Sequence, residues 1–307
     1  MQSLWMLVAS FLFSIMGVGV KLASSSYSVS EIVAYRGLIG MIVIFIVMRW
    51  QREALRTRMP LQHFWRGFVG VVALWLWFFA IGHLPLAMAV TLNYMSPIWI
   101  ALFLLTSAWV LKKRRVQPSL FFAIVLGFLG VILLLRPSLH PEQIGVALFA
   151  LLSGMLSALA YLQVRQLGMA GEPENRVVFY FSATCALAGT LAACLIGASN
   201  QQPVWHAHSL SSGLLLLLIG LTAAGAQVSM TRAYRLGNPL VTANLQYVGI
   251  VFSSIWDLLI WNDALNWMSW LGIVVILSSG IWASVINRTM MQAKAGNNSD
   301  ELATALK

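Results

Sequence analysis

The sequence predicts an all-α integral membrane protein whose ten transmembrane helices form two inverted five-helix repeats. The chain is 60% hydrophobic and only 9% charged, whereas a soluble protein carries about 25% charged residues. Its apolar stretches reach the roughly 20 residues that a bilayer requires, and its basic residues gather in every second loop. Because the backbone in lipid must satisfy its own hydrogen bonds, each apolar stretch is predicted to be a helix.

Ten stretches are long and apolar enough to span a membrane. The first half of the chain contains 3–22, 31–48, 65–81, 86–110 and 119–135, and the second half contains 144–164, 177–196, 210–230, 239–260 and 267–286. No positive charge precedes the first stretch and Lys21 follows it, so we expect a retained helix rather than a cleaved signal peptide. We assign 1–140 to the first repeat, 141–287 to the second and 288–307 to a polar cytoplasmic tail.

The loop charges predict the orientation of the chain. If the N-terminus is cytoplasmic, sixteen of the nineteen lysine and arginine residues fall on the cytoplasmic side, among them Arg66 in the loop before the third helix. The outer side keeps only Lys21 and Arg136, and Arg36 lies within the second helix. Positive residues accumulate in cytoplasmic loops, so we predict an inner-membrane (plasma-membrane) protein with both termini cytoplasmic. The net charge of +10 then reflects topology rather than nucleic-acid binding.

The two halves of the chain share a motif. The stretch from Pro85 to Tyr94 begins with Pro-Leu and ends with Leu-Asn-Tyr. The stretch from Pro239 to Tyr247 begins with Pro-Leu and ends with Leu-Gln-Tyr, with one residue fewer between them. Repeats of five helices have opposite orientations in the membrane because five is odd. Inverted repeats are typical of alternating-access carriers, which bind their substrate near the midplane between the halves.

Further motifs carry a resemblance to a known family: Lys21, Glu31-Ile-Val-Ala-Tyr-Arg36-Gly, Leu84-Pro-Leu-Ala87, Asn93-Tyr-Met-Ser-Pro97 and Gly127-Phe-Leu-Gly130. The chain resembles the drug/metabolite transporter superfamily, specifically the EamA-like proteins with ten helices in two five-helix repeats. The resemblance covers nearly the whole chain. In the second half Ile250 takes the position that matches Pro97, which leaves open whether the two halves bend alike around a site.

The resemblance implies a secondary transporter that moves a small metabolite, an amino-acid-like or nucleoside-like amphipathic solute, by alternating access. It favours export over import, and uptake or exchange of a nucleoside-type metabolite such as S-adenosylmethionine is the alternative. A membrane-embedded enzyme is the alternative from another class, but the sequence has no HExxH motif, no paired intramembrane aspartates and no phosphate-binding loop. We therefore expect no enzymatic activity, no cofactor and no metal. The expected partners are the solute and the lipid bilayer, without nucleic acid, and a homodimer stays open.

Neutral polar and aromatic residues are the candidates for substrate binding. The repeat pairs Asn93 and Tyr94 with Gln246 and Tyr247. An amide that faces lipid would lack hydrogen-bond partners, so these side chains should point into the bundle, where they either bond a neighbouring helix or meet the solute. Rings suit the flat body of an amphipathic ligand, and amides suit its polar head. The same reasoning adds Trp75, Tyr161 and Gln227.

Four charged residues are expected within the membrane or at its border: Lys21, Glu31, Arg36 and Asp257. Charge at this depth is costly and often functional, so each is a candidate for substrate binding or ion coupling. The structural alternative is that Glu31 and Arg36, within reach of each other or of Lys21, join the second helix to the first near the outer face. We interpret Asp257 as a hydrated residue at the membrane rim.

The charge bias generates a topology test. A reporter that is active only in the cytoplasm should be active when it is fused after Lys307, because an even number of helices returns the chain to the side on which it began. Activity measured in whole cells checks this. A signal only from a reporter that requires the periplasm would contradict it.

Overall fold

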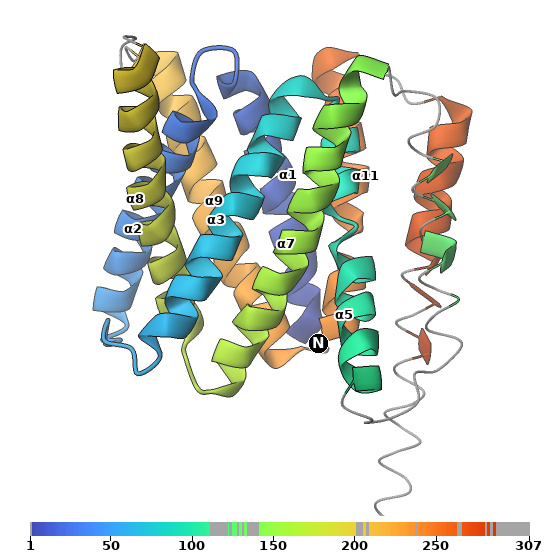
Figure 1. Cartoon of the computed structure of the whole chain (residues 1–307), viewed down its shortest axis with the longest axis horizontal. Coiled ribbons are helices and arrows are strands. Elements are labelled where there is room, and N and C mark those ends of the chain that lie inside the picture. The colour runs from blue at the N-terminus through green and yellow to red at the C-terminus, as the bar shows by residue number, and fades with distance from the viewer. Residues whose placement is uncertain are drawn as a thin grey trace, which may run out of the picture.

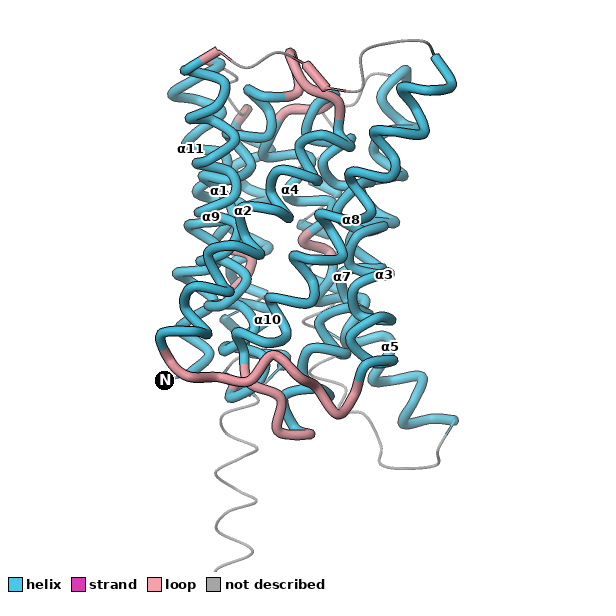
Figure 2. The backbone as a smooth tube through the Cα atoms, turned by 90° about the vertical axis from the view of Figure 1, so that its left-hand side faces the viewer, coloured by secondary structure: helices cyan, strands magenta, loops and turns pink. Residues whose placement is uncertain are grey.

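The computed structural model describes residues 2–110, 122, 125–127, 129–130, 132–133, 141–200, 205–206, 209–237, 239–262, 266–279, 281–282 and 285–286. Within these residues the only regular secondary structure is helix, and the helices run side by side between two ends of one bundle (Figures 1 and 2). The elements are η1 (Gln2–Leu4), α1 (Trp5–Ala23), α2 (Val29–Trp50), α3 (Pro60–His83), α4 (Leu86–Asn93), α5 (Ser96–Val110), η2 (Pro141–Gln143), α7 (Ile144–Met169), α8 (Glu174–Asn200), α9 (Leu210–Leu236), α10 (Pro239–Leu245), α11 (Val248–Trp256) and the π-helical turn η3 (Asp257–Trp261).

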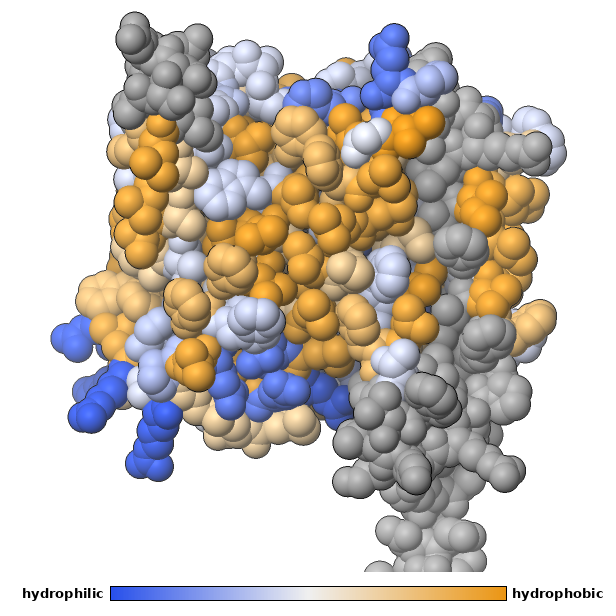
Figure 3. Space-filling view, viewed as in Figure 1, coloured by the Kyte–Doolittle hydropathy of each residue, from blue (hydrophilic) through white to orange (hydrophobic). Residues whose placement is uncertain are grey.

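Successive spans alternate in direction. The chain starts at the lower end of the bundle in Figure 1, where α2 and α9 finish and α3 and α8 begin. We call this end the N-terminal face and the other end the opposite face. Apolar side chains cover the middle of the visible face of the bundle, and hydrophilic side chains gather towards the two ends of the bundle (Figure 3). This distribution fits a protein that exposes its middle to lipid tails and its ends to water.

Eight helices in the described part of the chain are long and apolar enough to cross a membrane, when α4 with α5 and α10 with α11 and η3 each count as one span. A shorter apolar helix, Trp267–Ser279, lies within the predicted tenth span. Most of the predicted fifth span, 119–135, and the whole tail, 288–307, lie outside the described residues. The prediction of a multi-pass α-helical membrane protein is therefore confirmed, whereas the count of ten and the inverted repeat stay predictions.

The third span begins earlier than hydropathy predicts. The expected start was residue 65, but α3 begins at Pro60. Proline suits the first helical position, where no amide hydrogen is needed and the fixed backbone angle matches the helix. The added turn places Arg66 inside a membrane-spanning helix, so its prediction as a loop residue is wrong.

Two of the predicted spans are interrupted near their middle. The stretch predicted as 86–110 divides into α4 and α5 at Tyr94 and Met95. Pro97 accounts for this break, because it has no amide hydrogen to donate to the carbonyl of Asn93 and its ring crowds that carbonyl. The proline is thus sufficient to interrupt the helix between α4 and α5.

The second interruption lies at the matching place of the repeat motif. The stretch predicted as 239–260 divides into α10 and α11 at Gln246 and Tyr247. No proline follows here, and the turn is closed by tighter bonds: the amides of Gln246 and Tyr247 donate to carbonyls three residues earlier, at 3.2 and 3.1 Å. Both halves therefore break at corresponding positions although Ile250 replaces the proline.

Glycine residues let the spans approach closely. A Cβ atom on Gly37 of α2 would collide with the backbone nitrogen of Ala186 in α8, and one on Gly189 of α8 would lie 2.5 Å from the backbone nitrogen of Ala34 in α2. In lipid there is no hydrophobic driving force between helices, so they associate through close van der Waals packing. Small residues such as these allow that packing because the two backbones can touch.

This contact predicts the effect of one methyl group. Gly37→Ala should lower the stability by about 1–3 kcal/mol, because the backbone of α8 would have to move. The unfolding temperature in detergent measures the effect. The control is Gly145→Ala in the first turn of α7, where the added Cβ meets nothing within 4 Å. Equal stability of the two variants would show that α2 and α8 are less closely packed than described.

Candidate functional site

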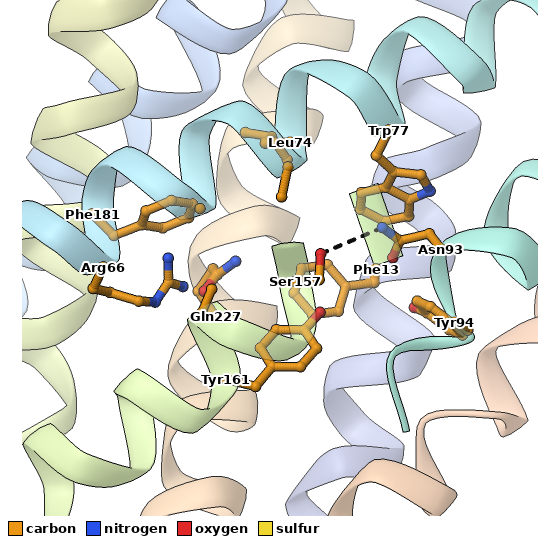
Figure 4. Close-up of a pocket in the computed structure, with 13 residues that line it drawn as sticks. Phe13, Arg66, Leu74, Trp77, Asn93, Tyr94, Ser157, Tyr161, Phe181 and Gln227 are labelled. Atoms are coloured by element: carbon orange, nitrogen blue, oxygen red, sulfur yellow. Dashed lines mark hydrogen bonds between the residues drawn. The ribbon is translucent and has the colours of Figure 1, made fainter. Parts of the chain in front are cut away.

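A cavity of about 40 Å³ lies inside the bundle, with room for roughly three water molecules. Six helices supply its walls: α1, α3, α4, α7, α8 and α9 (Figure 4). The lining residues are Phe13, Arg66, Gly70, Ala73, Leu74, Trp77, Asn93, Tyr94, Ser157, Ala160, Tyr161, Phe181 and Gln227. The set combines one cation, neutral hydrogen-bonding groups and aromatic rings, so the cavity suits a solute with both a polar and an apolar part.

Arg66 reaches the cavity from the second turn of α3. Its side chain is only 3% exposed, and its Nε and Nη1 atoms have no hydrogen-bond partner among the described residues. The guanidinium carbon lies 4.1 Å from the centre of the Phe181 ring. Hydropathy missed this residue because Arg66 resembles a loop cation; the preceding Pro60, a helix-start signal, was the feature in the sequence that could have revealed it.

Asn93, at the end of α4, faces the cavity and also joins two helices. Its Nδ2 atom donates to Ser153 Oγ at 2.7 Å and to Ser157 Oγ at 3.4 Å, both on α7 (Figure 4 shows the second bond). Gly154 allows this approach, because a Cβ there would lie 2.6 Å from the Asn93 carbonyl oxygen. The interruption between α4 and α5 is thus held against α7 by side-chain amide and hydroxyl groups.

Aromatic rings form a second wall of the cavity. Tyr94 lies against Gly249 of α11, and its ring centre is 6.3 Å from that of Trp77. Tyr161 stacks on Tyr234 with 5.1 Å between ring centres. Large rings lose little conformational entropy on burial and present flat apolar faces, so this wall can pack the body of a flat solute.

The structure divides the predicted substrate-binding residues into two groups. Asn93, Tyr94, Tyr161 and Gln227 line the cavity, whereas Gln246, Tyr247 and Trp75 do not. Trp77 lines it in place of Trp75, which lies on the other side of the same turn of α3. Contact of any of these residues with a solute stays a prediction.

Gln246 connects elements around the second break. Its side chain is fully buried. The Oε1 atom accepts from Ser96 Oγ at 3.4 Å, and the Nε2 atom donates to Tyr161 Oη at 3.5 Å. These contacts join α5, α7 and the α10–α11 break, so the side chain holds helices together at the level of the cavity.

An ion pair joins three spans near the opposite face. Lys21 Nζ of α1 lies 3.3 Å from Asp257 Oδ1 and 4.2 Å from the centre of the Trp261 ring. Asp257 also accepts hydrogen bonds from the backbone amides of Leu86 and Ala87, the first residues of α4. Asp257 is 1% exposed, so its interpretation as a hydrated rim residue is wrong. The π-helical turn buries its carboxylate against the positive end of α4.

Glu31 and Arg36 bind different partners, so the expectation that they meet each other or Lys21 is wrong. Glu31 caps α2, since its Oε2 accepts from the backbone nitrogen of Ser28 at 2.9 Å, and its Oε1 accepts from the backbone nitrogen of His206 at 2.8 Å. Arg36 Nη1 donates to Cys185 Sγ of α8 at 3.4 Å. The capping-box spacing from Ser28 to Glu31 was the sequence signal for the first role.

A polar cluster joins the spans at the N-terminal face. Glu172, in the turn between α7 and α8, accepts from Thr57 Oγ1 at 2.6 Å and from Arg176 Nη1 at 2.9 Å, and lies 3.5 Å from His63 Nε2. Arg235 at the end of α9 pairs with Glu174 at 2.6 Å. Charged contacts therefore connect the spans at both faces, with the cavity between them.

The chain is similar to known membrane transporters. Residues 1–136 match the model of the EamA-like transporter family. The pseudopaline exporter CntI of Pseudomonas aeruginosa is 33% identical over 270 residues, which cover 88% of this chain and 91% of the relative. A riboflavin transporter of Rhizobium johnstonii is 25% identical over 284 residues, which cover 91% of this chain and 89% of the relative. Human solute carrier family 35 member G1 is 22% identical over 294 residues, which cover 91% and 77%.

The fold is shared with a solved crystal structure. That structure aligns with a TM-score of 0.72 and 21% sequence identity, covering 94% of this chain and 98% of the other chain. At this identity the similarity concerns the arrangement of helices and not the substrate.

Glu172 generates a pH prediction. Burial of the carboxyl opposes its ionisation, but hydrogen bonds from Thr57 and Arg176 outweigh this effect, and the pKa of Glu172 lies below its ordinary value. A lowered folded-state pKa adds stability that is present above the unfolded-state pKa and is lost as the pH falls through the folded-state pKa. The unsubstituted protein should therefore unfold at a higher temperature than Glu172→Gln at pH 7, and the difference should disappear in acid.

The matched control for this measurement is Glu142→Gln, which removes an exposed carboxyl beside α7 at the opposite face. It should leave the unfolding temperature close to that of the unsubstituted protein at every pH. A Glu172→Gln difference that stays constant into acid would assign its effect to packing rather than to charge.

Proposed function

Since the chain belongs to the EamA-like transporter family of small-molecule membrane transporters, we propose that it carries a small amphipathic metabolite across the inner membrane by alternating access. The observation that carries the proposal is the central cavity. It is lined by polar and aromatic side chains at the level where α4 ends, and ion pairs join spans at both faces, Lys21 with Asp257 at one and Arg235 with Glu174 at the other. A carrier needs a site that is separated from both sides of the membrane in at least one state.

The size of the cavity supports a conformational change. A volume of about 40 Å³ holds a few waters, whereas small-molecule sites usually measure about 300–1,000 Å³. A metabolite can therefore bind only when spans move apart. The interrupted spans α4–α5 and α10–α11 are the elements best suited to move, because discontinuous helices surround the binding sites of many carriers.

The packing pattern supports the inverted repeat. If the spans of the two halves correspond in order, α1 matches α7, α2 matches α8, and α3 matches α9. A two-fold axis then requires that α1 with α9 and α3 with α7 make equivalent contacts, and that α2 packs on α8. Each of these three pairs is in contact. The axis also relates α4 with α7 to α10 with α1, and α5 with α7 to α11 with α1, and all four of these pairs are in contact.

The proposed direction is export, with both termini in the cytoplasm. The loop charges support the orientation, and the relative at 33% identity is named an exporter. Uptake or exchange of S-adenosylmethionine is less well supported, because its sulfonium cation would enter a cavity whose described walls contain a cation and no carboxylate. A membrane enzyme is disfavoured for a similar reason: the same walls offer no histidine, carboxylate or thiol as a base or nucleophile.

The test is a transport screen in proteoliposomes. Purified protein is reconstituted and supplied with labelled amino acids, nucleosides and organic acids, with and without a pH gradient. We expect saturable movement of at least one solute in protein-containing vesicles and none in empty vesicles. Vesicles that move none of the panel in either direction would contradict the proposal, and turnover of a solute into a new compound would support the enzyme instead.

Variants of the two interruptions distinguish substrate contact from helix packing. Asn93→Ala and Tyr94→Ala should raise the apparent KM for transport about three- to tenfold, because both residues line the cavity. Gln246→Ala should lower the unfolding temperature in detergent at an unchanged KM, because its bonds join helices. Initial rates normalised to protein in the membrane provide the measurement.

The control for these variants is Phe64→Ala, which removes a ring that is 64% exposed on the outside of α3. Its KM should equal that of the unsubstituted protein. Parental KM values for both Asn93→Ala and Tyr94→Ala would place the solute elsewhere in the bundle.

A further inference from the structure

Two buried guanidinium groups lie close together, and no carboxylate of the described residues pairs with either. Arg36 is 2% and Arg66 is 3% exposed, and their guanidinium carbons lie 5.2 and 4.1 Å from the centre of the same Phe181 ring. The ion pairs of the described residues involve other cations. Arg36 has one weak partner, the thiol of Cys185, whereas the Nε and Nη1 atoms of Arg66 have none among the described residues.

The described carboxylates are committed elsewhere. Asp257 pairs with Lys21, Glu31 with His206, Glu172 with Arg176 and Glu174 with Arg235. Of the other two described carboxylates, Glu53 accepts a hydrogen bond from Asn175 at 3.2 Å, and Glu142 is exposed. An internal anion for Arg66 is therefore missing from the part of the chain that the structure describes.

Burial of the Arg66 guanidinium without an anionic partner among the described residues is energetically unfavourable and needs an explanation. Removing a cation from water without a partner is strongly unfavourable, and contact with one aromatic face offsets only part of that cost. The fold nevertheless makes room for the group: a Cβ on Gly70, one turn after Arg66, would collide with Arg66 Nη1 and lie 2.8 Å from the Phe181 ring. The guanidinium thus occupies a niche that a glycine keeps open, with its donors next to the cavity.

We propose that Arg66 binds the carboxylate of the transported solute, an inference that rests on the proposed function and specifies its substrate class. The planar guanidinium presents two parallel donors that match a carboxylate. Figure 4 shows Arg66 at one end of the group, with Gln227 next to it and the Tyr161 and Trp77 rings further along. A carboxylate at Arg66 therefore places an apolar or flat body against these rings.

Arg36 adds a positive charge beside this arrangement. It does not line the cavity. Its charge on the shared Phe181 ring raises the positive potential around Arg66 and makes a second cation in the cavity unfavourable. The substrate class that follows is an organic acid with an apolar body, and organic cations are excluded.

The experiment measures binding of three probes that share a benzyl group. Phenylacetate carries a carboxylate, phenylacetamide is its neutral analogue and benzylphosphonate carries a phosphoryl-type anion. Isothermal titration of the full-length protein in detergent at pH 7 should give a dissociation constant for phenylacetate that is about ten- to a hundredfold lower than that for phenylacetamide. Equal affinity for these two probes, or no binding of either, would overturn the inference. Tighter binding of benzylphosphonate would overturn the assignment to a carboxylate.

Variants assign the preference to Arg66. Arg66→Gln should bind phenylacetate no better than phenylacetamide, and Gly70→Ala should weaken phenylacetate by displacing the guanidinium. The charge-matched control, Arg49→Gln, changes an exposed residue at the end of α2 and should keep the full preference. A preference that survives in Arg66→Gln would contradict the proposal.

The unfolding temperature of Arg66→Gln distinguishes a binding role of Arg66 from a structural role. Because Arg66 pairs with no carboxylate among the residues that the structure describes, Arg66→Gln should unfold at a temperature equal to or above that of Arg49→Gln. A clearly lower unfolding temperature would identify Arg66 as a packing residue. Binding in detergent does not depend on transport, so Arg66-dependent binding without flux would contradict only the proposed function, and flux of a neutral solute unaffected by Arg66→Gln would contradict only this inference.

Discussion

A helix that stops inside a bilayer leaves peptide groups without hydrogen-bond partners, and the centre of this protein is built around meeting that requirement. Near the opposite face, the amides that begin α4 donate to the Asp257 carboxylate, which Lys21 neutralises. At the other end of α4, Asn93 bonds the hydroxyl groups of α7, and Gly154 allows the two backbones to meet. Polar side chains are therefore concentrated where the spans are interrupted, and the cavity lies among them.

The protein treats its buried charges in two ways. Lys21 and Asp257 neutralise each other and join α1, α4 and η3. Their interaction therefore stabilises the packing of these helices. Arg66 is also buried, but among the described residues its guanidinium meets the Phe181 ring and the space left by Gly70, and no carboxylate. A paired charge holds helices, whereas an unpaired charge beside a cavity attracts an anion from outside the chain. Pairing therefore distinguishes the structural charges, Lys21 and Asp257, from Arg66, for which we propose a role in binding.

Several predictions from the sequence were confirmed because they depend on composition and spacing along one span. Apolar stretches of sufficient length are helices, and Asn93, Tyr94, Tyr161 and Gln227 point into the bundle. The errors have two causes. Hydropathy averages over a window, so it placed Arg66 in a loop and made the spans at 86–110 and 239–260 continuous. It also cannot see a distant partner, so it assigned Asp257 to the rim, although Lys21, 236 residues earlier in the chain, neutralises it.

Composition and short patterns were enough to predict that the chain folds in a bilayer, where most of its described spans lie and which family it resembles, because apolar length, loop charge and short motifs are local properties. Which polar residues share a cavity, and which described charges have no ion-pair partner, depends on how the helices pack. Trp77 rather than Trp75 lines that cavity, and Arg36 and Arg66 converge on Phe181. These facts depend on how α2, α3 and α8 rotate and approach one another, and the glycine contacts that set this geometry act between residues far apart in the chain.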